Sequence, residues 1–125
     1  MLGLLDSTVI VHLLRHYNPA LNWFDASQTF GISSITWMEI VVGVTNKQNM
    51  RETLEFLDGF DIYFITQDDQ LWAQEQLKRL RFSHHTGMND CLIASVAYRL
   101  QTTLYTHNLK HMTPLIGKLA VKPYG

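Results

Sequence analysis

The sequence predicts an α/β fold in three layers, with a central, mostly parallel sheet of four to five strands and helices on both faces. Short apolar runs alternate along the 125-residue chain with longer segments in which apolar residues recur at helical spacing. This alternation is typical of parallel sheets, because a helix usually carries the chain from one strand to the next. The length suits one compact core, so we expect residues 1–125 to form a single domain.

The strands are predicted from runs of β-branched, aromatic and other apolar residues that end at turn or capping residues. These runs are Leu2–Leu5, Phe30–Ser33, Ile62–Ile65 and Thr103–Thr106, with a weaker one at Leu119–Lys122. All of them are far too short to span a membrane.

The helices are predicted from apolar stripes at intervals of three and four residues. The stripes are Ile10, Leu13 and Leu14 after the first run; Trp37, Ile40, Val41 and Val44 after the second; Leu71, Trp72 and Leu77 after the third; and Ile93, Val96, Ala97 and Leu100 before the fourth. A further helix is expected over residues 48–59, ending at Gly59. In such folds ligands bind beyond the carboxyl ends of the strands, which directs the search for chemistry to the residues that follow each run.

Composition and charge narrow the possible functions. With 10 Lys and Arg against 11 Asp and Glu, the chain lacks the strong positive charge of proteins that hold nucleic acid by neutralising phosphates alone. The single cysteine, Cys91, allows no internal disulfide, and the first residues do not read as a signal peptide. We therefore expect a cytoplasmic protein in which any nucleic-acid function depends on a local patch or a bound cation.

Three acidic residues, Asp6, Glu39 and Asp90, lie where predicted strands end or the following helices begin. The fourth strand ends in Thr106 and Asn108, whose polar groups could point into the same cleft. If these strand ends converge, the carboxylates repel one another unless a hard cation such as Mg²⁺ or Mn²⁺ lies among them. Oxygen ligands with few nitrogens favour those ions over zinc.

Each acidic residue also has a purely structural explanation. Asp6 can cap the first helix, and Thr36 with Glu39 matches a capping box, in which the Glu side chain reaches back to the cap. Asp90 can interact with a helix dipole while Asn89 serves as the helix cap. Taken one at a time, these residues leave both explanations open.

The ordered set of motifs resembles the PIN-domain nucleases, and more narrowly the VapC-type toxins of bacterial toxin–antitoxin pairs. The matching segments are Leu4-Leu5-Asp6-Ser7-Thr8, then Thr36-Trp37-Met38-Glu39 with Gly43, then Asn89-Asp90-Cys91-Leu92-Ile93-Ala94, then Thr106-His107-Asn108. They span nearly the whole chain, and the resemblance implies a PIN-like fold.

The resemblance implies that Asp6, Glu39 and Asp90 are the catalytic, metal-binding residues. It also implies that Ser7 and Thr106 are supporting hydroxyls near the site. Asn108 occupies a fourth polar position that is often Asp and often Asn in this family. An Asn there removes one charge, which weakens the case for a tightly held second ion.

The implied function is that of a metal-dependent endoribonuclease, a toxin that hydrolyses phosphodiester bonds in RNA with Mg²⁺ or Mn²⁺. The resemblance further implies a homodimer that is inhibited by a small antitoxin protein. Two alternatives remain open. One is a PIN-fold nuclease of RNA processing or DNA repair without an antitoxin, and the other is a catalytically silent PIN fold that acts as an interaction module.

The only basic cluster spans residues 78–85 and includes Arg79 and Arg81. By default it is a solvated helix end, where cations favour the C-terminal dipole. Beside a nuclease site, Arg79 and Arg81 would form a rim that holds phosphates. Among the six histidines no zinc motif is found, and His12, near an apolar stripe, is expected to be a hydrogen-bonded residue at the edge of the core.

Overall fold

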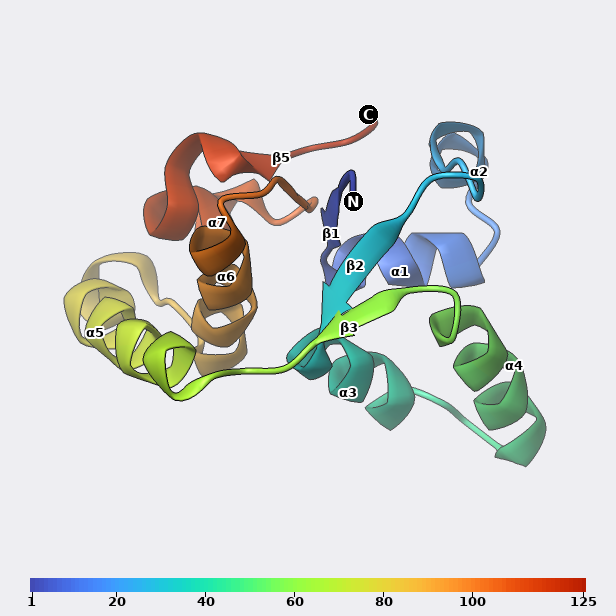
Figure 1. Cartoon of the computed structure of the whole chain (residues 1–125), viewed down its shortest axis with the longest axis horizontal. Coiled ribbons are helices and arrows are strands. Elements are labelled where there is room, and N and C mark those ends of the chain that lie inside the picture. The colour runs from blue at the N-terminus through green and yellow to red at the C-terminus, as the bar shows by residue number, and fades with distance from the viewer.

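The computed structural model describes residues 1–125 and contains one sheet of five parallel strands in the order β3-β2-β1-β4-β5 (Figure 1). The strands are β1 (Gly3–Leu5), β2 (Phe30–Ser33), β3 (Asp61–Tyr63), β4 (Leu104–Tyr105) and β5 (Ala120–Val121). The predicted fold class is therefore confirmed, and the sheet is parallel throughout. All five strands lie at the predicted places, and all but β2 are shorter than predicted.

The helices are α1 (Ser7–Leu14), α2 (Asn18–Trp23), α3 (Ser34–Val42), α4 (Lys47–Leu57), α5 (Gln67–His84), α6 (Met88–Leu100) and α7 (Leu109–Ile116), followed by a 3₁₀ turn, η1 (Gly117–Leu119). Helix α2 is missing from the sequence prediction, because its six residues are too few to show an apolar stripe and no side chain caps its start. Helix α3 is shorter than its predicted stripe, since Gly43 is its C-cap and Val44 lies beyond it.

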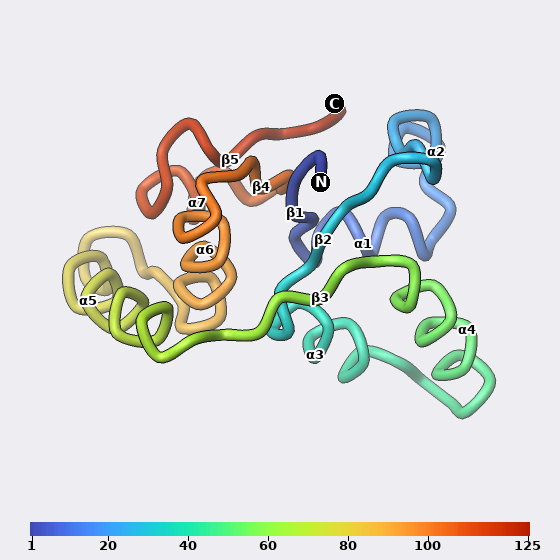
Figure 2. The backbone as a smooth tube through the Cα atoms, viewed as in Figure 1, coloured from blue at the N-terminus to red at the C-terminus, as the bar shows by residue number.

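The central strand β1 separates two apolar cores, because successive side chains of a strand point to opposite faces. Leu4 packs with buried residues of α5, α6 and α7, whereas Leu5 packs with residues of α1, α3 and α4. The backbone trace shows the same division, with α5 to α7 on one side and α1 to α4 on the other (Figure 2). Each face of the sheet therefore has its own core.

Strand β1 is flanked by β2 on one side and by β4 on the other. At Gly3 an added Cβ would lie 2.8 Å from the Thr103 carbonyl oxygen and 2.8 Å from the Tyr105 ring. Glycine is therefore required for the close approach of β1 and β4. This approach brings the carboxyl ends of β1 and β4 together at one edge of the sheet.

Helices α5 and α6 are joined by a partly buried ion pair. Asp69 is 3% exposed; it closes a capping box with Thr66 at the start of α5 and lies 3.0 Å from Arg99 Nε of α6. This contact helps to place α6, whose first turn contains Asp90. No helix of the structure has the length and apolar character needed to cross a membrane.

Candidate active site

Asp6 lies at the junction of β1 and α1, where it is 4% exposed. Its Oδ1 accepts a hydrogen bond from the Ser7 backbone N–H at 2.8 Å, and its Oδ2 accepts one from the Thr106 hydroxyl at 2.7 Å. Asp6 is therefore both the cap of α1 and the contact between β1 and the end of β4. Burial raises its pKa from 3.8 to about 6, against the lowering effect of these two hydrogen bonds.

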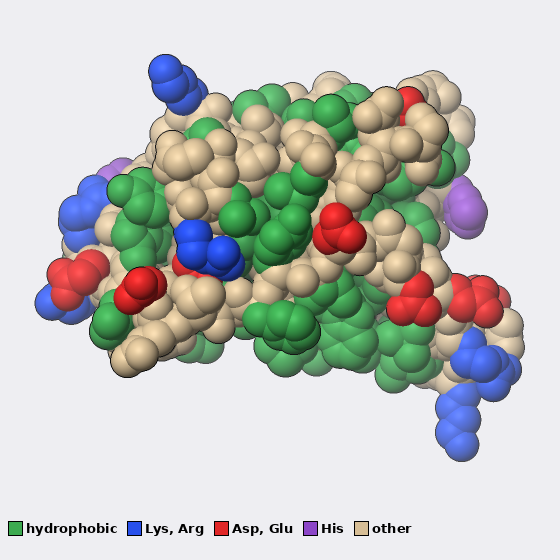
Figure 3. Space-filling view, viewed as in Figure 1, with side chains coloured by type: hydrophobic (Ala, Val, Ile, Leu, Met, Phe, Trp, Pro, Cys, Tyr) green, Lys and Arg blue, Asp and Glu red, His purple; other side chains and the backbone are tan.

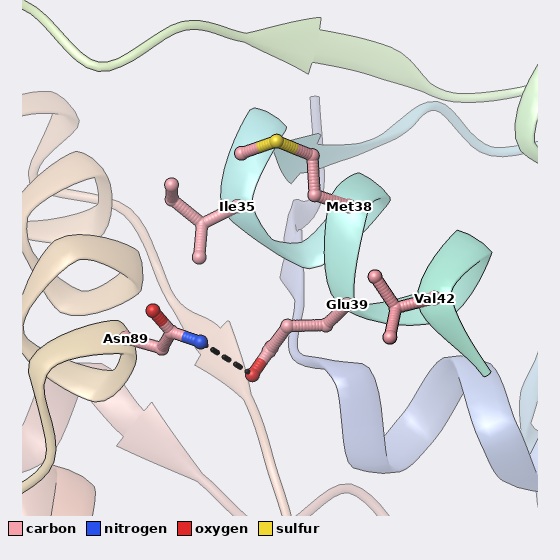
Figure 4. Close-up of a pocket in the computed structure, with 5 residues that line it drawn as sticks. All are labelled: Ile35, Met38, Glu39, Val42 and Asn89. Carbon is pink, nitrogen blue, oxygen red and sulfur yellow. Dashed lines mark hydrogen bonds between the residues drawn. The ribbon is translucent and has the colours of Figure 1, made fainter.

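Glu39 lies in the middle of α3, with its carboxylate between two donors. The Ser7 hydroxyl donates to Oε1 at 2.5 Å, and the Asn89 side-chain amide donates to Oε2 at 3.3 Å (Figure 4). The predicted capping box of Thr36 and Glu39 is wrong, because α3 begins one turn earlier. Its cap is Ser33, whose hydroxyl accepts from the Thr36 N–H at 3.1 Å, so Glu39 is free to face α1 and α6.

Asp90 lies in the first turn of α6, half-buried, with its Oδ2 3.6 Å from His111 Nδ1 of α7. Burial raises the pKa of Asp90, His111 counteracts this, and the charge of Glu39 raises it further. The expectation that Asn89 caps this helix is wrong. The cap position is Gly87, which has no capping side chain, and Asn89 lies inside the helix, where it contacts Glu39.

The acidic residues of the site are near enough for their charges to raise the pKa of Asp6 and of Asp90. The negative charges of Asp90 and Glu39 both add to the raised pKa of Asp6, and Glu39 adds to that of Asp90. Ser7 bonds to Asp6 through its backbone and to Glu39 through its hydroxyl, and Asn89, next to Asp90, bonds to Glu39, so the three acidic residues belong to one hydrogen-bonded region beside the end of β1.

The donor chemistry of this region fits a hard divalent cation. It supplies three carboxylates, with the His111 imidazole 3.6 Å from Asp90, and a ligand set rich in carboxylate oxygens favours Mg²⁺ and Mn²⁺ over zinc. No three side chains of the ligating types are close enough together to enclose an ion. The fit therefore rests on the kind and charge of the donors.

The loop after β4 completes the polar edge. Thr106 is fully buried, and its Oγ1 accepts a hydrogen bond from the Asn108 N–H at 2.9 Å while its hydroxyl donates to Asp6. Asn108 begins α7 without using its side chain as a cap. The structure thus brings Ser7 and Thr106 into hydrogen-bond contact with the acidic residues, and it places Asn108 on the adjoining turn.

The two arginines of the basic cluster bond to backbone carbonyls. Arg79 donates to the Pro114 carbonyl at 3.3 Å, and Arg81 donates to the His85 and Thr86 carbonyls at 3.3 and 3.0 Å. Neither makes an ion pair with a carboxylate of the candidate site. Arg81 nevertheless supports the turn that leads into α6, and its role toward a phosphate stays a prediction.

Two contacts of the site were missed by sequence reasoning. Asn89 bonds to Glu39 across 50 residues of sequence, and the Thr8 hydroxyl accepts the backbone N–H of His107 at 3.1 Å. Both residues belong to the motifs that carry the resemblance, and this is the only signal that could have pointed to them.

The comparison with known families agrees with this geometry. The PIN domain family model matches residues 3–111, and the chain belongs to the PIN domain family. No curated protein sequence matches the chain.

Several solved structures of bacterial toxin–antitoxin proteins share the fold. The chain is 28% identical to a chain of a toxin–antitoxin complex from Klebsiella pneumoniae, with 98% of each chain covered and a TM-score of 0.76. It is 25% identical to a chain of VapBC2 from Rickettsia felis, solved with a DNA fragment of its promoter, with 97% and 98% covered and a TM-score of 0.80. The VapBC structure from Salmonella typhimurium, at 21% identity, 94% and 95% coverage and a TM-score of 0.76, shows the same fold. The resemblance to VapC-type proteins is confirmed.

Replacing Asp6 by Asn should stabilise the metal-free protein at neutral pH. Because the pKa of Asp6 is raised on folding, stability is lost as the pH rises from 3.8 to about 6 and stays lower above that. Asp6→Asn removes this cost and should gain roughly 2 kcal/mol at pH 7 in urea unfolding.

The control for this experiment is Glu55→Gln, which neutralises an exposed acid of α4 and should change stability by less than about 0.5 kcal/mol. Added Mn²⁺ should stabilise the wild type more than Asp6→Asn. If the Asp6→Asn protein is less stable than the wild type at pH 7, the conclusion that the buried charge of Asp6 destabilises the fold is contradicted.

Proposed function

We propose that this protein is a metal-dependent endoribonuclease and the toxin of a toxin–antitoxin pair. The observation that carries the proposal is the group of Asp6, Glu39 and Asp90 at the carboxyl edge of a PIN-domain sheet. The likeness to toxin–antitoxin structures at 28% and 25% identity supports the toxin role, and we propose a cytoplasmic location for it.

In this proposal Asp6, Glu39 and Asp90 hold Mg²⁺ or Mn²⁺. The ion supplies Lewis-acid chemistry, because it acidifies water and offsets negative charge on the scissile phosphate. Ser7 and Thr106 keep the Glu39 and Asp6 carboxylates in place through their hydroxyl groups. Asn108 offers a neutral amide on the adjoining turn, and Arg79 and Arg81 form a rim for the phosphates of single-stranded or looped RNA.

Cleavage of single-stranded RNA should require Mg²⁺ or Mn²⁺ and should stop in EDTA, with no need for zinc. Asp6→Asn, Glu39→Gln and Asp90→Asn should each lower the cleavage rate by about a hundredfold or more, because each removes a charge that holds the ion. The rate is measured with a fluorescent RNA oligonucleotide, and circular dichroism checks that the fold is kept.

Glu55→Gln makes the same chemical change as Glu39→Gln on the exposed side of α4 and should cleave as the wild type does. Full activity in EDTA would refute the metal mechanism. Near-normal turnover of two of the three variants would refute the site. A wild-type protein that cleaves no RNA with either ion would favour the silent interaction module.

A groove between the first four helices is the candidate site for the antitoxin. It has a volume of about 650 Å³ and runs from the apolar residues of α1 and α2 to Glu39. Its lining includes the apolar residues Leu14, Leu21, Phe24 and Phe56, the acids Glu39 and Glu52, and also Arg15 and His16. A segment of the antitoxin that is disordered when free could fold into this groove and place a basic side chain among the carboxylates. An Arg is the favoured residue, because its guanidinium forms bidentate pairs with carboxylates.

If a small reading frame adjoins this gene, co-expression with its product should yield an inactive complex, which regains cleavage when the partner is proteolysed. Leu21→Asp, at the exposed edge of the groove, should weaken the complex by about tenfold or more, because it places a charge on the apolar wall. Leu71→Asp changes a comparably exposed leucine of α5 outside the groove and serves as the control.

Affinity is measured by isothermal titration, and cleavage by both free variants should match the wild type. Equal binding by Leu21→Asp and wild type would place the antitoxin elsewhere. The absence of a partner gene, together with harmless expression of the protein alone, would favour a nuclease of RNA processing or DNA repair.

We propose a homodimer that forms through the outer face of α3. Met38 and Val42 are 49% and 84% exposed, and Figure 3 shows hydrophobic side chains gathered over this helix. Together with Ile35 they form an apolar face directly beside Glu39 and Asn89 (Figure 4). A second copy seated there would bring two acidic sites close to each other.

Sedimentation of the wild type should give a dimer, and Val42→Asp should shift it to the monomer, because two copies would bury like charges against each other. Val121→Asp, at an exposed valine of β5, is the control and should remain dimeric. A wild type that stays monomeric, or a Val42→Asp variant that stays dimeric, would contradict this face.

A further inference from the structure

A cluster of aromatic and imidazole rings lies beside the loop that follows β4. It contains His12 from α1, Tyr17 from the start of α2, His107 from the loop and Tyr124 from the C-terminal segment. The ring centroids of His12 and His107 are 4.8 Å apart, and those of His107 and Tyr124 are 4.5 Å apart. Residues 12–17, the loop after β4 and the C-terminal segment thus meet at one place.

Tyr124 is tied into this cluster by a hydrogen bond as well as by ring packing. A bond of 2.8 Å joins its hydroxyl to His12 Nδ1, which confirms that His12 is a hydrogen-bonded residue at the edge of the core. Tyr124 also packs against Trp23, at 5.8 Å between ring centroids. Burial raises the pKa of Tyr124 from 10.0 to about 12, because the surroundings of the hydroxyl disfavour its charged form.

The His107 side chain is held by these rings rather than by hydrogen bonds. Its Nε2 is buried and has no hydrogen-bond partner, and burial lowers the pKa of the imidazole, which favours the neutral form. The backbone on either side of this ring is part of the candidate active site. Thr106 donates to Asp6, the His107 N–H donates to Thr8, and the Asn108 N–H donates to Thr106.

We propose that Tyr124 is a positioning residue for the active site, which it serves by holding the His107 ring and thereby the loop 106–108 against Asp6. The consequence for catalysis rests on the proposed nuclease function, whereas the effect on the loop does not. Tyr124 contacts no acidic residue of the site, so it acts only through His107 and His12.

The test compares Tyr124→Ala, Tyr124→Phe and the control Tyr98→Ala. Tyr98 stacks on Trp72 at 4.9 Å in another part of the molecule, so its loss removes a similar packing contact away from the loop. Amide hydrogen exchange is measured at His107 and Asn108, and cleavage of a fluorescent RNA oligonucleotide with Mn²⁺ gives kcat and KM.

Tyr124→Ala should speed exchange at these two amides by about tenfold relative to Tyr98→Ala and should lower kcat by about tenfold, with KM changed by less than about twofold. Tyr124→Phe keeps the ring and should show smaller effects of the same sign. If Tyr124→Ala does not fold, amide exchange and kcat of Tyr124→Phe decide whether the proposal holds, since this variant lacks only the hydroxyl that bonds to His12.

Unchanged exchange in the Tyr124 variants would overturn the proposal. Faster exchange with an unchanged kcat would also overturn it, because the loop would then be loosened without consequence for the site. A wild type that cleaves no RNA would refute the proposed function alone. In that case faster exchange in Tyr124→Ala would still support the hold on the loop, and equal exchange would still refute it.

Discussion

The structure depends on a carboxylate buried at the end of its central strand. Asp6 caps α1 and accepts a hydrogen bond from the Thr106 hydroxyl, and burial raises its pKa to about 6. Because β1 is flanked on both sides, no strand end lies closer to the middle of the sheet edge. A buried charge at that place is unfavourable on its own, so the fold keeps it only with donors around it. The Ser7 backbone N–H and the Thr106 hydroxyl supply these donors, and the bond from Thr106 also connects the end of β1 to the end of β4.

The hydrogen bonds of the site form a chain that joins four segments. The Ser7 backbone N–H donates to Asp6 and the Ser7 hydroxyl donates to Glu39, so one residue connects two of the acids. Asn89, beside Asp90, extends the chain to α6. Rigid placement of charged groups is what preorganised sites need, since a site that must rearrange around each ion or phosphate loses binding energy to that rearrangement. The repulsion among the acids, however, opposes this order when no cation offsets it.

The order of the strands and of the longer helices was predictable from periodicity, because it reflects burial along continuous segments. The strand Phe30–Ser33 matches its prediction residue for residue, and its last residue, Ser33, is also the cap of the helix that follows. The helix caps were less predictable. Ser33 and Thr36 are both good caps three residues apart, and only the packed structure decides between them. Asn89 likewise lies inside α6, where it bonds to Glu39 instead of capping the helix. Because Glu39 lies 50 residues earlier, the sequence around Asn89 does not indicate this contact. Helix α2 was too short for its periodicity to be recognised.

The place of Asp6 was predictable because it follows from topology, whereas its acidic neighbours and the partners of all three acids follow from packing. A parallel sheet brings its strand ends to one edge whatever residues they hold, which places Asp6 there, whereas Glu39 in α3 and Asp90 in α6 reach the same region through the packing of their helices. Which hydroxyl or amide meets each carboxylate depends on how α1, α3 and α6 pack against each other, as the bonds of Ser7 and Asn89 to Glu39 show. The same distinction applies to the C-terminal segment. Nothing local to Tyr124 marks it as a neighbour of the site, and it becomes one only because β5 lies beside β4 and directs the chain back toward α1.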